Sequence, residues 1–491
     1  MPEAPALWQD GHTFSYAELG DLSRRVAGWL EQAGVETGSR VGVLAGRGVT
    51  AFAGILGACW AGCAWVPLNP AHPVGRLNAL LQRAELDALI VDKAGASLLP
   101  ELESHSRVLG PELSLAKAVD YPPVPRKGDD LAYLMFTSGT TGVPKGVMIT
   151  HSAIDHFLVV MQERYSIGPA DRVSQFFELT FDLSVFDIFM SLGNGATLCV
   201  LPELLRLGPA GFIREQKLTV WFSVPSAIVL MDRFGQLKPG VFPDIRLSLF
   251  CGEPLPAEPV IKWKTAAHDS VVENLYGPTE ATLACLLQPC SPEIPVTPER
   301  GSVAIGHPYP GMKAAILNSE EHFVHPGEPG ELLLAGPQLA AGYWRDGSLT
   351  DERFITLDGT RWYRSGDLAR QDEDGCFHHL GRTDNQVKIL GHRVELEEID
   401  KHLRDACQSD SAMAVAWPVK HGSAQGIVAF ITGSDLSVAE IREGMTKRVP
   451  EYMVPRQVRF LESLPLSSNG KFDRKALVDL LKTPNHRQEN A

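Results

Sequence analysis

A ten-residue stretch, Thr137–Gly146, has the composition of a phosphate-binding loop. It reads Thr-Ser-Gly-Thr-Thr-Gly-Val-Pro-Lys-Gly and follows the apolar run 131–136, which predicts a strand that leads into a loop. Glycines let backbone N–H groups approach phosphate oxygens, hydroxyls add hydrogen bonds, and Lys145 supplies a compact positive charge. The spacing is not that of a Walker P-loop, because Gly139 and Gly142 lie too close together. Loops of this composition are also common at protein surfaces, so the function depends on the rest of the chain.

The 491-residue chain has an ordinary globular composition, with 44% hydrophobic and 21% charged residues, and is long enough for two or more domains. Its formal net charge of −14 argues against a general binder of nucleic acid or of anionic membranes, because both need a basic surface. The eight cysteines lack zinc-ligand spacing, and the first residues lack the pattern of a signal peptide, so we expect reduced thiols in a cytoplasmic protein. The uncharged stretch 48–75 is interpreted as a buried helix and strand rather than a membrane span.

Helical periodicities alternate with short apolar runs as far as residue 250, which predicts open, mainly parallel sheets covered by helices on both faces. Residues 101–130 are expected to form a surface connection. Helices are predicted over 16–34, 76–83, 153–165 and 186–192, strands over 40–44, 88–91, 196–201, 220–224 and 247–250, and a helix followed by a strand over 51–68.

After residue 308 the pattern changes to short strands at 314–317, 330–334 and 377–380, separated in part by Pro-Gly turns. The tail predicts an amphipathic helix at 395–403, a strand at 426–431 and a last helix at 473–481. We therefore predict an α/β protein with a large N-terminal domain of mainly parallel α/β sheets, a β-rich subdomain, and a small α+β C-terminal domain.

Four further motifs follow the phosphate-binding loop in the chain. They are Tyr276-Gly-Pro-Thr-Glu280, Tyr363-Arg-Ser-Gly-Asp367, the run 381–388 (Gly-Arg-Thr-Asp-Asn-Gln-Val-Lys), and Asn469-Gly-Lys471. Together the five motifs resemble the adenylate-forming superfamily, and the chain most resembles the amino-acid adenylation domains of nonribosomal peptide synthesis. The motifs appear in that family's order and span nearly all of the chain. The resemblance implies a ligase with a core domain over 1–383 and a mobile domain over 384–491.

The resemblance also implies a site for ATP and Mg²⁺. When a carboxylate attacks the α-phosphorus and pyrophosphate leaves, the charge around that phosphorus must be neutralised. Glu280 would bind Mg²⁺, which prefers carboxylate and phosphate oxygens, and Asp367 would accept the ribose hydroxyls. Tyr276 would stack on adenine. The implied ATP-binding residues are Thr137, Ser138, Gly139, Thr140, Thr141, Lys145, Gly252, Glu253, Tyr276, Thr279, Asp367 and Arg382. Read alone, each motif would be an ordinary turn or surface charge.

Lys471 resembles the family's catalytic lysine, which bridges the substrate carboxylate and the α-phosphate. A point charge on a flexible stem suits this role, because the negative charge moves during the reaction. Most lysines are solvated surface residues, and nearby Lys475 has no motif around it. The position directly after Asn-Gly is what favours the catalytic role for Lys471. Asp384 matches the family's hinge, about which the C-terminal domain would rotate after adenylation.

Asp182 aligns with the aspartate that grips the substrate α-ammonium group in amino-acid adenylation domains. The alternative is a helix N-cap, since Asp precedes an apolar helical run here. A buried carboxylate without a cation is costly, so a pocket-facing Asp182 would disfavour aryl and fatty acids. By the same resemblance, the amino-acid pocket would be lined by apolar or nearly apolar side chains. They are Leu183, Phe186, Phe222, Leu249, Cys251, Leu275, Leu283 and Ala284.

This lining implies a small apolar amino acid. The set resembles the stand-alone proline-adenylating enzymes of pyrrole pathways, while the runs 250–253 and 276–282 also resemble D-alanine–carrier protein ligases. Phe222 and Leu275 argue against alanine, so L-proline is favoured. No carrier signature follows Lys471, and we expect the acceptor to be a separate carrier protein bearing phosphopantetheine, with coenzyme A as the alternative. An acyl- or aryl-CoA ligase and a non-catalytic nucleotide-binding protein remain the competing interpretations.

Overall fold

A computed structural model of the chain describes residues 1–104, 106–112, 117–139, 144–389, 391–420, 423–465 and 472–482. The chain divides into two compact units. The first comprises Met1–Pro70, Leu80–Thr137 and Lys145–Asp384, and the second comprises Ala71–Ala79, Ser138–Pro144 and Asn385–Ala491.

The first unit contains a nine-stranded sheet in the order β17-β14-β13-β12-β11-β9-β10-β1-β2. The six strands from β13 to β1 in this order run parallel to their neighbours, and the antiparallel strands lie at the two edges. The strands are β1 (Pro5–Gln9), β2 (His12–Ser15), β9 (Arg172–Gln175), β10 (Thr197–Val200), β11 (Val220–Ser223), β12 (Leu247–Phe250), β13 (Val271–Tyr276), β14 (Leu286–Pro289) and β17 (His307–Pro308). The predicted α/β class with mainly parallel sheets is confirmed.

A seven-stranded sheet in the same unit has the order β20-β8-β7-β4-β3-β5-β6. It consists of β3 (Arg40–Leu44), β4 (Ala64–Leu68), β5 (Ala88–Val91), β6 (Arg107–Leu109), β7 (Leu131–Thr137), β8 (Lys145–Thr150) and β20 (Gly342–Tyr343). β6 pairs in parallel with β5, within the segment that was predicted to be only a surface connection. That prediction was wrong at this point, because three residues are too few for a readable period of two.

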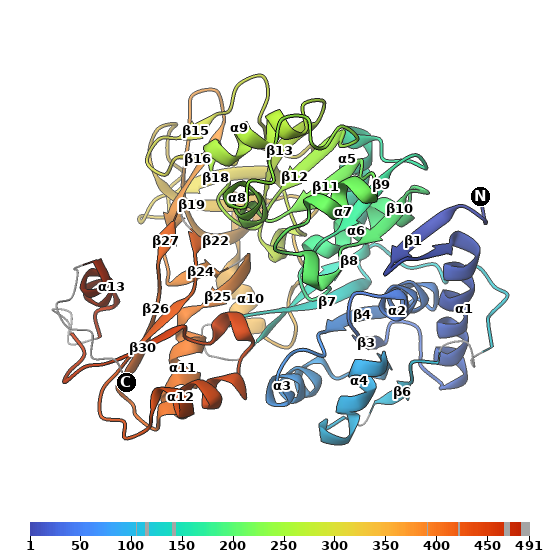
Figure 1. Cartoon of the computed structure of the whole chain (residues 1–491), viewed down its shortest axis with the longest axis horizontal. Coiled ribbons are helices and arrows are strands. Elements are labelled where there is room, and N and C mark those ends of the chain that lie inside the picture. Colours follow the sequence, from blue (N-terminus) through green and yellow to red (C-terminus); the bar gives the residue numbers. More distant parts are fainter. Residues whose placement is uncertain are drawn as a thin grey trace. The chain divides into compact units, whose positions relative to one another are not determined.

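Helices α5 (His151–Tyr165) and α6 (Leu183–Leu192) lie between these two sheets (Figure 1). α5 packs on β7, β8 and α6, while α6 packs on β9 and β10. Since both faces of α6 are covered, nearly all of its side chains are buried. Its one charged residue, Asp187, accepts a hydrogen bond from the backbone N–H of Phe176 at 3.1 Å. Burial raises the pKa of Asp187 well above its usual range.

Helix α1 (Tyr16–Gln32) begins with a capping box. The Ser15 side chain accepts from the backbone N–H of Glu18, and the Glu18 carboxylate accepts from the backbone N–H of Ser15. α1 packs on α2 (Val49–Trp60), which is followed by β4, so the uncharged stretch is a buried helix and strand as predicted. Over the described ranges, the helices are all too short or too polar to cross a membrane.

Trp263 of α9 (Ala257–Ala266) fixes this helix to the nine-stranded sheet. Its fully buried ring stacks on Trp221 of β11 with centroids 6.1 Å apart and meets the edge of Phe250 of β12 at 5.6 Å. Its indole N–H donates to the hydroxyl of Ser248 at 2.8 Å. Because strand side chains alternate between faces, these contacts direct the neighbouring residues, Phe222 and Leu249, to the opposite face of the sheet.

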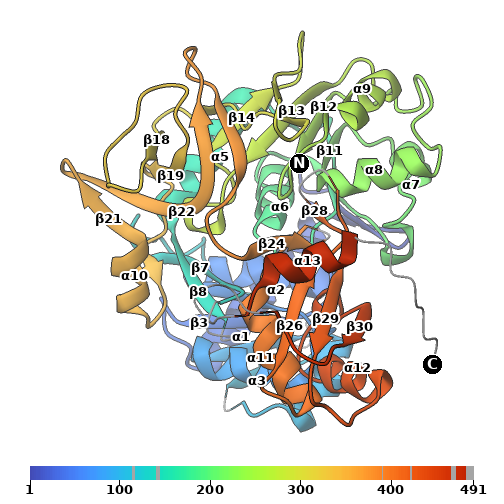
Figure 2. The ribbon, with the colours of Figure 1, turned by 90° about the vertical axis from the view of Figure 1, so that its left-hand side faces the viewer.

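The predicted β-rich subdomain is a five-stranded antiparallel sheet in which β23 extends from β22. Figure 2 shows its strands gathered beside α10 (Gly347–Arg353). They are β18 (Lys313–Leu317), β19 (Gly330–Ala335), β21 (Phe354–Leu357), β22 (Thr360–Gln371) and β23 (Phe377–Arg382).

The second unit has its own core and two small sheets, β25-β24-β28-β27 and β26-β29-β30. Helix α11 packs on β26 and on α12. The elements are β24 (Gln386–Ile389), β25 (His392–Glu395), α11 (Leu396–Cys407), β26 (Ala412–Ala416), β27 (Val419–Lys420), β28 (Ser423–Ala424), β29 (Ile427–Ile431), α12 (Val438–Thr446), β30 (Gln457–Phe460) and α13 (Arg474–Lys482).

Replacement of Trp263 by alanine is expected to destabilise the first unit. Truncation of a buried tryptophan costs about 3–5 kcal/mol, which lowers the unfolding temperature by several degrees in a chain of this size. Differential scanning calorimetry would measure the shift. Phe234→Ala is the control, since that side chain is 57% exposed and its loss should change the midpoint little. Equal shifts in both variants would contradict the proposed anchoring role of Trp263.

Candidate active site

Three of the predicted amino-acid pocket residues, Phe222, Leu249 and Leu275, lie near the carboxyl ends of β11, β12 and β13. Phe222 and Leu249 are paired in the parallel register of β11 and β12. Phe222 meets Phe186 of α6 edge to face, with centroids 5.0 Å apart and planes at 74°. Ligands of open α/β sheets bind at the carboxyl ends of strands, so the position fits a substrate site.

All eight predicted pocket residues are at most 2% exposed. Gly252, two residues after the end of β12, has a φ of +91°, and a Cβ built there would lie 3.5 Å from Leu183. This positive φ suits glycine, because an L side chain rarely adopts it. The predicted pocket residues are therefore all buried, and none of them belongs to the residue types that are formally charged at neutral pH.

Asp182 directly precedes α6 and is 4% exposed. Its backbone is helical (φ −60°, ψ −24°), and its side chain makes no capping hydrogen bond, so the N-cap alternative is excluded for this carboxylate. Burial, and then the charge of Asp182, raise the pKa of Tyr133 of β7 well above its usual range.

Glu280 lies on the short 3₁₀ turn Thr279–Ala281 that follows β13 and is fully buried. The hydroxyl of Tyr343 donates to its carboxylate at 2.7 Å, and the ammonium of Lys145 lies 3.9 Å away. Lys145 also lies 5.5 Å from the ring centroid of Tyr343. The structure thus brings the predicted metal ligand and the predicted phosphate-binding lysine together. A buried carboxylate beside a lysine suits Mg²⁺ and phosphate binding.

Thr137 ends β7 and pairs across the hairpin with Lys145. Its hydroxyl oxygen is buried and has no hydrogen-bond partner within the part of the chain that the structure describes. A buried hydroxyl in this state is costly, and a phosphate oxygen would satisfy it, so the residues present fit ATP. Ser138 groups with the second unit, where its hydroxyl donates to the carbonyl of Arg393 at 2.9 Å.

Gly139 also groups with the second unit. The predicted phosphate ligands Thr140 and Thr141 and the predicted catalytic Lys471 lie outside the described residues.

Asp367 of β22 has three donors around its carboxylate and is 8% exposed. Tyr276 donates its hydroxyl, Arg382 its Nη1 at 2.8 Å, and the Nε2 of His379 lies at 3.3 Å. Burial alone would raise the pKa of Asp367, but the charge of Arg382 and the hydrogen bonds from His379 and Tyr276 hold it well below its usual range. The stability from these contacts is therefore present above about pH 4 and is lost only as the pH falls through the lower folded value.

His379 was missed in the sequence, where it is one of two adjacent histidines in a strand. The register between β22 and β23 shifts between Leu368 and Ala369, so that Leu380 is an extra residue in β23. This bulge changes the alternation of side chains and lets both His379 and Arg382 face Asp367. No motif in the sequence signals the bulge.

The stacking of Tyr276 on adenine stays a prediction. The hydroxyl of Tyr276 donates a hydrogen bond to Asp367. Burial, and then the Asp367 charge, raise the pKa of Tyr276 well above its usual range, so it remains a hydrogen-bond donor. Of the other predicted residues, Glu253 accepts from the backbone N–H of Ser226 at 2.8 Å, at the start of α8 (Pro225–Arg233). Thr279 is buried beside Glu280.

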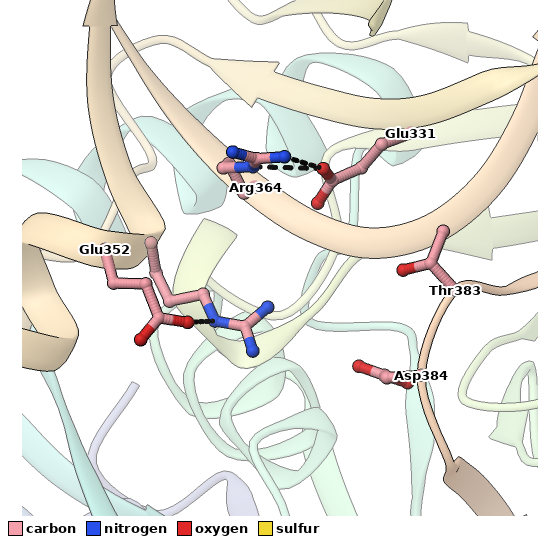
Figure 3. Close-up of a pocket in the computed structure, with 6 residues that line it drawn as sticks. Glu331, Glu352, Arg364, Thr383 and Asp384 are labelled. Carbon is pink, nitrogen blue, oxygen red and sulfur yellow. Dashed lines mark hydrogen bonds and ion pairs between the residues drawn. The ribbon is translucent and has the colours of Figure 1, made fainter. Parts of the chain in front are cut away.

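Arg382 also binds the predicted hinge residue. Its Nε and Nη2 donate to the two carboxylate oxygens of Asp384 at 2.6 and 2.8 Å. Asp384 borders a polar cavity of about 240 Å³, shown in Figure 3. There Arg364 donates two hydrogen bonds to Glu331, at 3.0 and 2.7 Å. The remaining lining residues are Glu352, Arg353 and Thr383.

Two protein-family models match the chain. The family model described as AMP-binding enzyme matches residues 1–344, and that of the AMP-binding enzyme C-terminal domain matches residues 408–471. The chain belongs to the AMP-binding enzyme family. This confirms the predicted membership of the adenylate-forming superfamily.

Relatives of this AMP-binding enzyme include tyrocidine synthases 2 and 3 of Brevibacillus parabrevis. They are 34% and 36% identical over 97% of this chain, which spans only 13% and 7% of their lengths. A solved structure, the adenylation domain AlmE of Vibrio cholerae in complex with glycyl-adenosine-5'-phosphate, is 33% identical with a TM-score of 0.86. That similarity covers 98% of this chain and 95% of AlmE.

Asp367→Asn is expected to weaken AMP binding about tenfold, because charge-assisted hydrogen bonds contribute roughly 1.5–3 kcal/mol and the amide cannot replace them. Isothermal titration calorimetry would measure the Kd. Asp372→Asn is the matched control: it lies just after β22, 2.8 Å from His378, and should leave the Kd within about twofold. An unchanged Kd for Asp367→Asn would remove Asp367 from the nucleotide site.

Proposed function

We propose that this AMP-binding enzyme activates a small apolar amino acid with ATP to form an aminoacyl-adenylate. L-proline is the favoured substrate and alanine the next. The aminoacyl group then passes to the phosphopantetheine thiol of a separate carrier protein. The observation that carries the proposal is the buried Asp182 at the start of α6, which does not cap the helix and directly precedes the buried Leu183.

The buried carboxylate of Asp182 favours an amino acid, rather than an amine-free acid, as the substrate. A carboxylate that is 4% exposed is costly to keep charged, and a substrate ammonium group would offset that cost. An aryl or fatty acid has no such cation and would bring a second negative charge. The acyl- and aryl-CoA ligase alternatives are therefore less compatible with this pocket.

The aromatic rings near the proposed site favour a substrate amino acid with a small side chain. Phe222 contacts Phe186 and Phe177 edge to face, with centroids 5.0 and 4.8 Å apart, and both partners are fully or nearly fully buried. These rings consume volume and offer no hydrogen bond, so large or polar side chains are excluded. The glycyl-adenylate bound to AlmE adds glycine to the amino acids that need to be tested.

The charged groups of the first unit support ATP as the second substrate. Lys145 and the hydroxyl of Thr137 would bind phosphate oxygens, and Asp367 with Arg382 would orient the ribose. Glu280 would hold Mg²⁺, which would supply positive charge at the phosphates as pyrophosphate leaves. Tyr343 keeps the Glu280 carboxylate in place through its 2.7 Å hydrogen bond.

The C-terminal region, which we assign to 384–491, would supply Lys471 to neutralise charge between the substrate carboxylate and the α-phosphate. Asp384 would serve as the hinge for a rotation that withdraws Lys471 before thiol attack. The Arg382–Asp384 ion pair supports this role, since it fixes the hinge residue until the contacts are broken.

ATP–pyrophosphate exchange tests the proposed function directly. The panel comprises L-proline, L-alanine, D-alanine, glycine and two amine-free acids, one aromatic and one aliphatic. Exchange with one or more of the small amino acids supports the proposal, and exchange with amine-free acids alone overturns the amino-acid assignment. Loading of a phosphopantetheinylated carrier protein or of coenzyme A, followed by mass spectrometry, distinguishes the two acceptors.

Asp182→Asn is expected to lower amino-acid-dependent exchange at least about tenfold and up to a hundredfold, because the ion pair with the α-ammonium is lost. AMP binding should remain unchanged. Asp187→Asn is the matched control on the same helix. Its burial already favours the neutral acid, and an asparagine oxygen can accept the Phe176 N–H, so exchange should stay within about threefold. Equal activity of Asp182→Asn and the wild type would contradict the substrate role of Asp182.

Lys471→Ala is expected to reduce adenylation by two or more orders of magnitude while ATP binding stays within a few fold, since its charge acts on the reacting groups. Stopped-flow measurement of adenylate formation and calorimetric ATP titration would separate the two effects. Lys475→Ala on α13 is the control and should retain activity. Full activity of Lys471→Ala would show that another group neutralises the charge.

A further inference from the structure

The loop that carries two of the pocket residues has an unusual backbone. After Glu280, Thr282 and Leu283 both have positive φ values, 53° and 72°. Such conformations cost on the order of 1–3 kcal/mol for residues other than glycine and persist only where the surroundings enforce them. A bulky Leu283 in this conformation therefore requires an external support.

Gln338, in the segment that follows β19, provides that support. The side chain is fully buried, and its amide nitrogen lies 2.7 Å from the carbonyl oxygen of Ala284 and 3.3 Å from that of Ala281. Its own backbone carbonyl accepts a hydrogen bond from the hydroxyl of Thr282 at 2.6 Å. One residue thus binds both ends and the middle of the loop.

His156 of α5 orients the amide of Gln338. Its Nδ1 lies 3.1 Å from Oε1 of Gln338. Since Oε1 can only accept, Nδ1 must carry the proton in this contact, and the amide nitrogen is then directed toward the loop carbonyls. The orientation of the amide therefore depends on a helix that packs against α6, where Phe186 lies.

The metal-ligand end of the loop has a separate support. The carbonyl of Glu280 accepts a hydrogen bond from the backbone N–H of Ala340 at 2.8 Å, which does not involve the Gln338 side chain. Loss of the Gln338 amide would therefore affect the wall formed by Leu283 and Ala284 more than the position of Glu280.

We propose that Gln338, oriented by His156, is a positioning residue that determines amino-acid selectivity by holding the 281–284 loop in its strained conformation. Gln338 acts through Leu283 and Ala284 and does not contact the substrate. The selectivity part of this inference rests on the proposed function, whereas the support of the loop does not depend on it.

The decisive variant is Gln338→Met, which keeps the volume of the side chain and removes its hydrogen bonds. We expect the KM for the preferred amino acid to rise about tenfold and its advantage in kcat/KM over the next amino acid of the panel to fall by a similar factor. The KM for ATP should stay within about twofold. Gln288→Met is the matched control, because its amide binds Pro289 in β14 and not the loop. It should leave selectivity unchanged.

Hydrogen–deuterium exchange separates this inference from the proposed function. In Gln338→Met, but not in Gln288→Met, peptides that cover residues 279–286 should exchange faster, whether or not the enzyme turns over the panel. If the wild type shows no ATP–pyrophosphate exchange with the amino acids of the panel, the proposed function is overturned, and with it the selectivity part of the inference. The deuterium measurement still tests the support of the loop. If exchange in 279–286 is unchanged in Gln338→Met, the support itself is overturned.

His156→Phe provides a second route if Gln338→Met does not fold. This variant removes the donor to Oε1 of Gln338. It should lower amino-acid selectivity and speed deuterium exchange in residues 279–286, each by about threefold. Unchanged amino-acid selectivity in the folded variant, with an active wild type, overturns the role of Gln338 in selectivity.

Discussion

The buried carboxylates of the first unit need other groups close to them, and this need determines which parts of the chain must meet. Asp182, Glu280 and Asp367 are each at most 8% exposed, and a buried charge is tolerated only where other groups approach it. Glu280 has Tyr343 and Lys145, and the strands that carry these two residues, β20 and β8, are hydrogen-bonded neighbours. The pairing of β20 with β8 therefore brings distant parts of the chain to one carboxylate.

The regular elements could be predicted from the sequence where their hydrophobic pattern was long or fully apolar. The strands 40–44 and 247–250 were predicted at their observed bounds, and the helix predicted over 16–34 is observed at Tyr16–Gln32. The N-terminal hairpin β1–β2 and the short β6 were not predicted, because their stability comes from pairing with β10 and β5. A short strand defined by its neighbours has no local signal.

The site residues likewise fall into those with a signal in the sequence and those without one. Asp367, Arg382, Lys145 and Glu280 belong to motifs, and the structure brings Arg382 to Asp367 and Lys145 to Glu280. His379 and Gln338 belong to none, since their roles depend on a strand bulge and on contacts with backbone carbonyls far along the chain. Backbone carbonyls are present at every residue, so no side-chain pattern marks which of them a glutamine will bind.

The extra residue in β23 has a consequence for how this strand tolerates change in length. Because Leu380 has no partner across the ladder, His379 and Arg382 reach one carboxylate although their positions in a regular strand would face opposite sides. A deletion of one residue here would restore regular pairing and would turn either His379 or Arg382 away from Asp367. The number of residues between His379 and Arg382 is thus fixed by the contacts that both side chains make with Asp367.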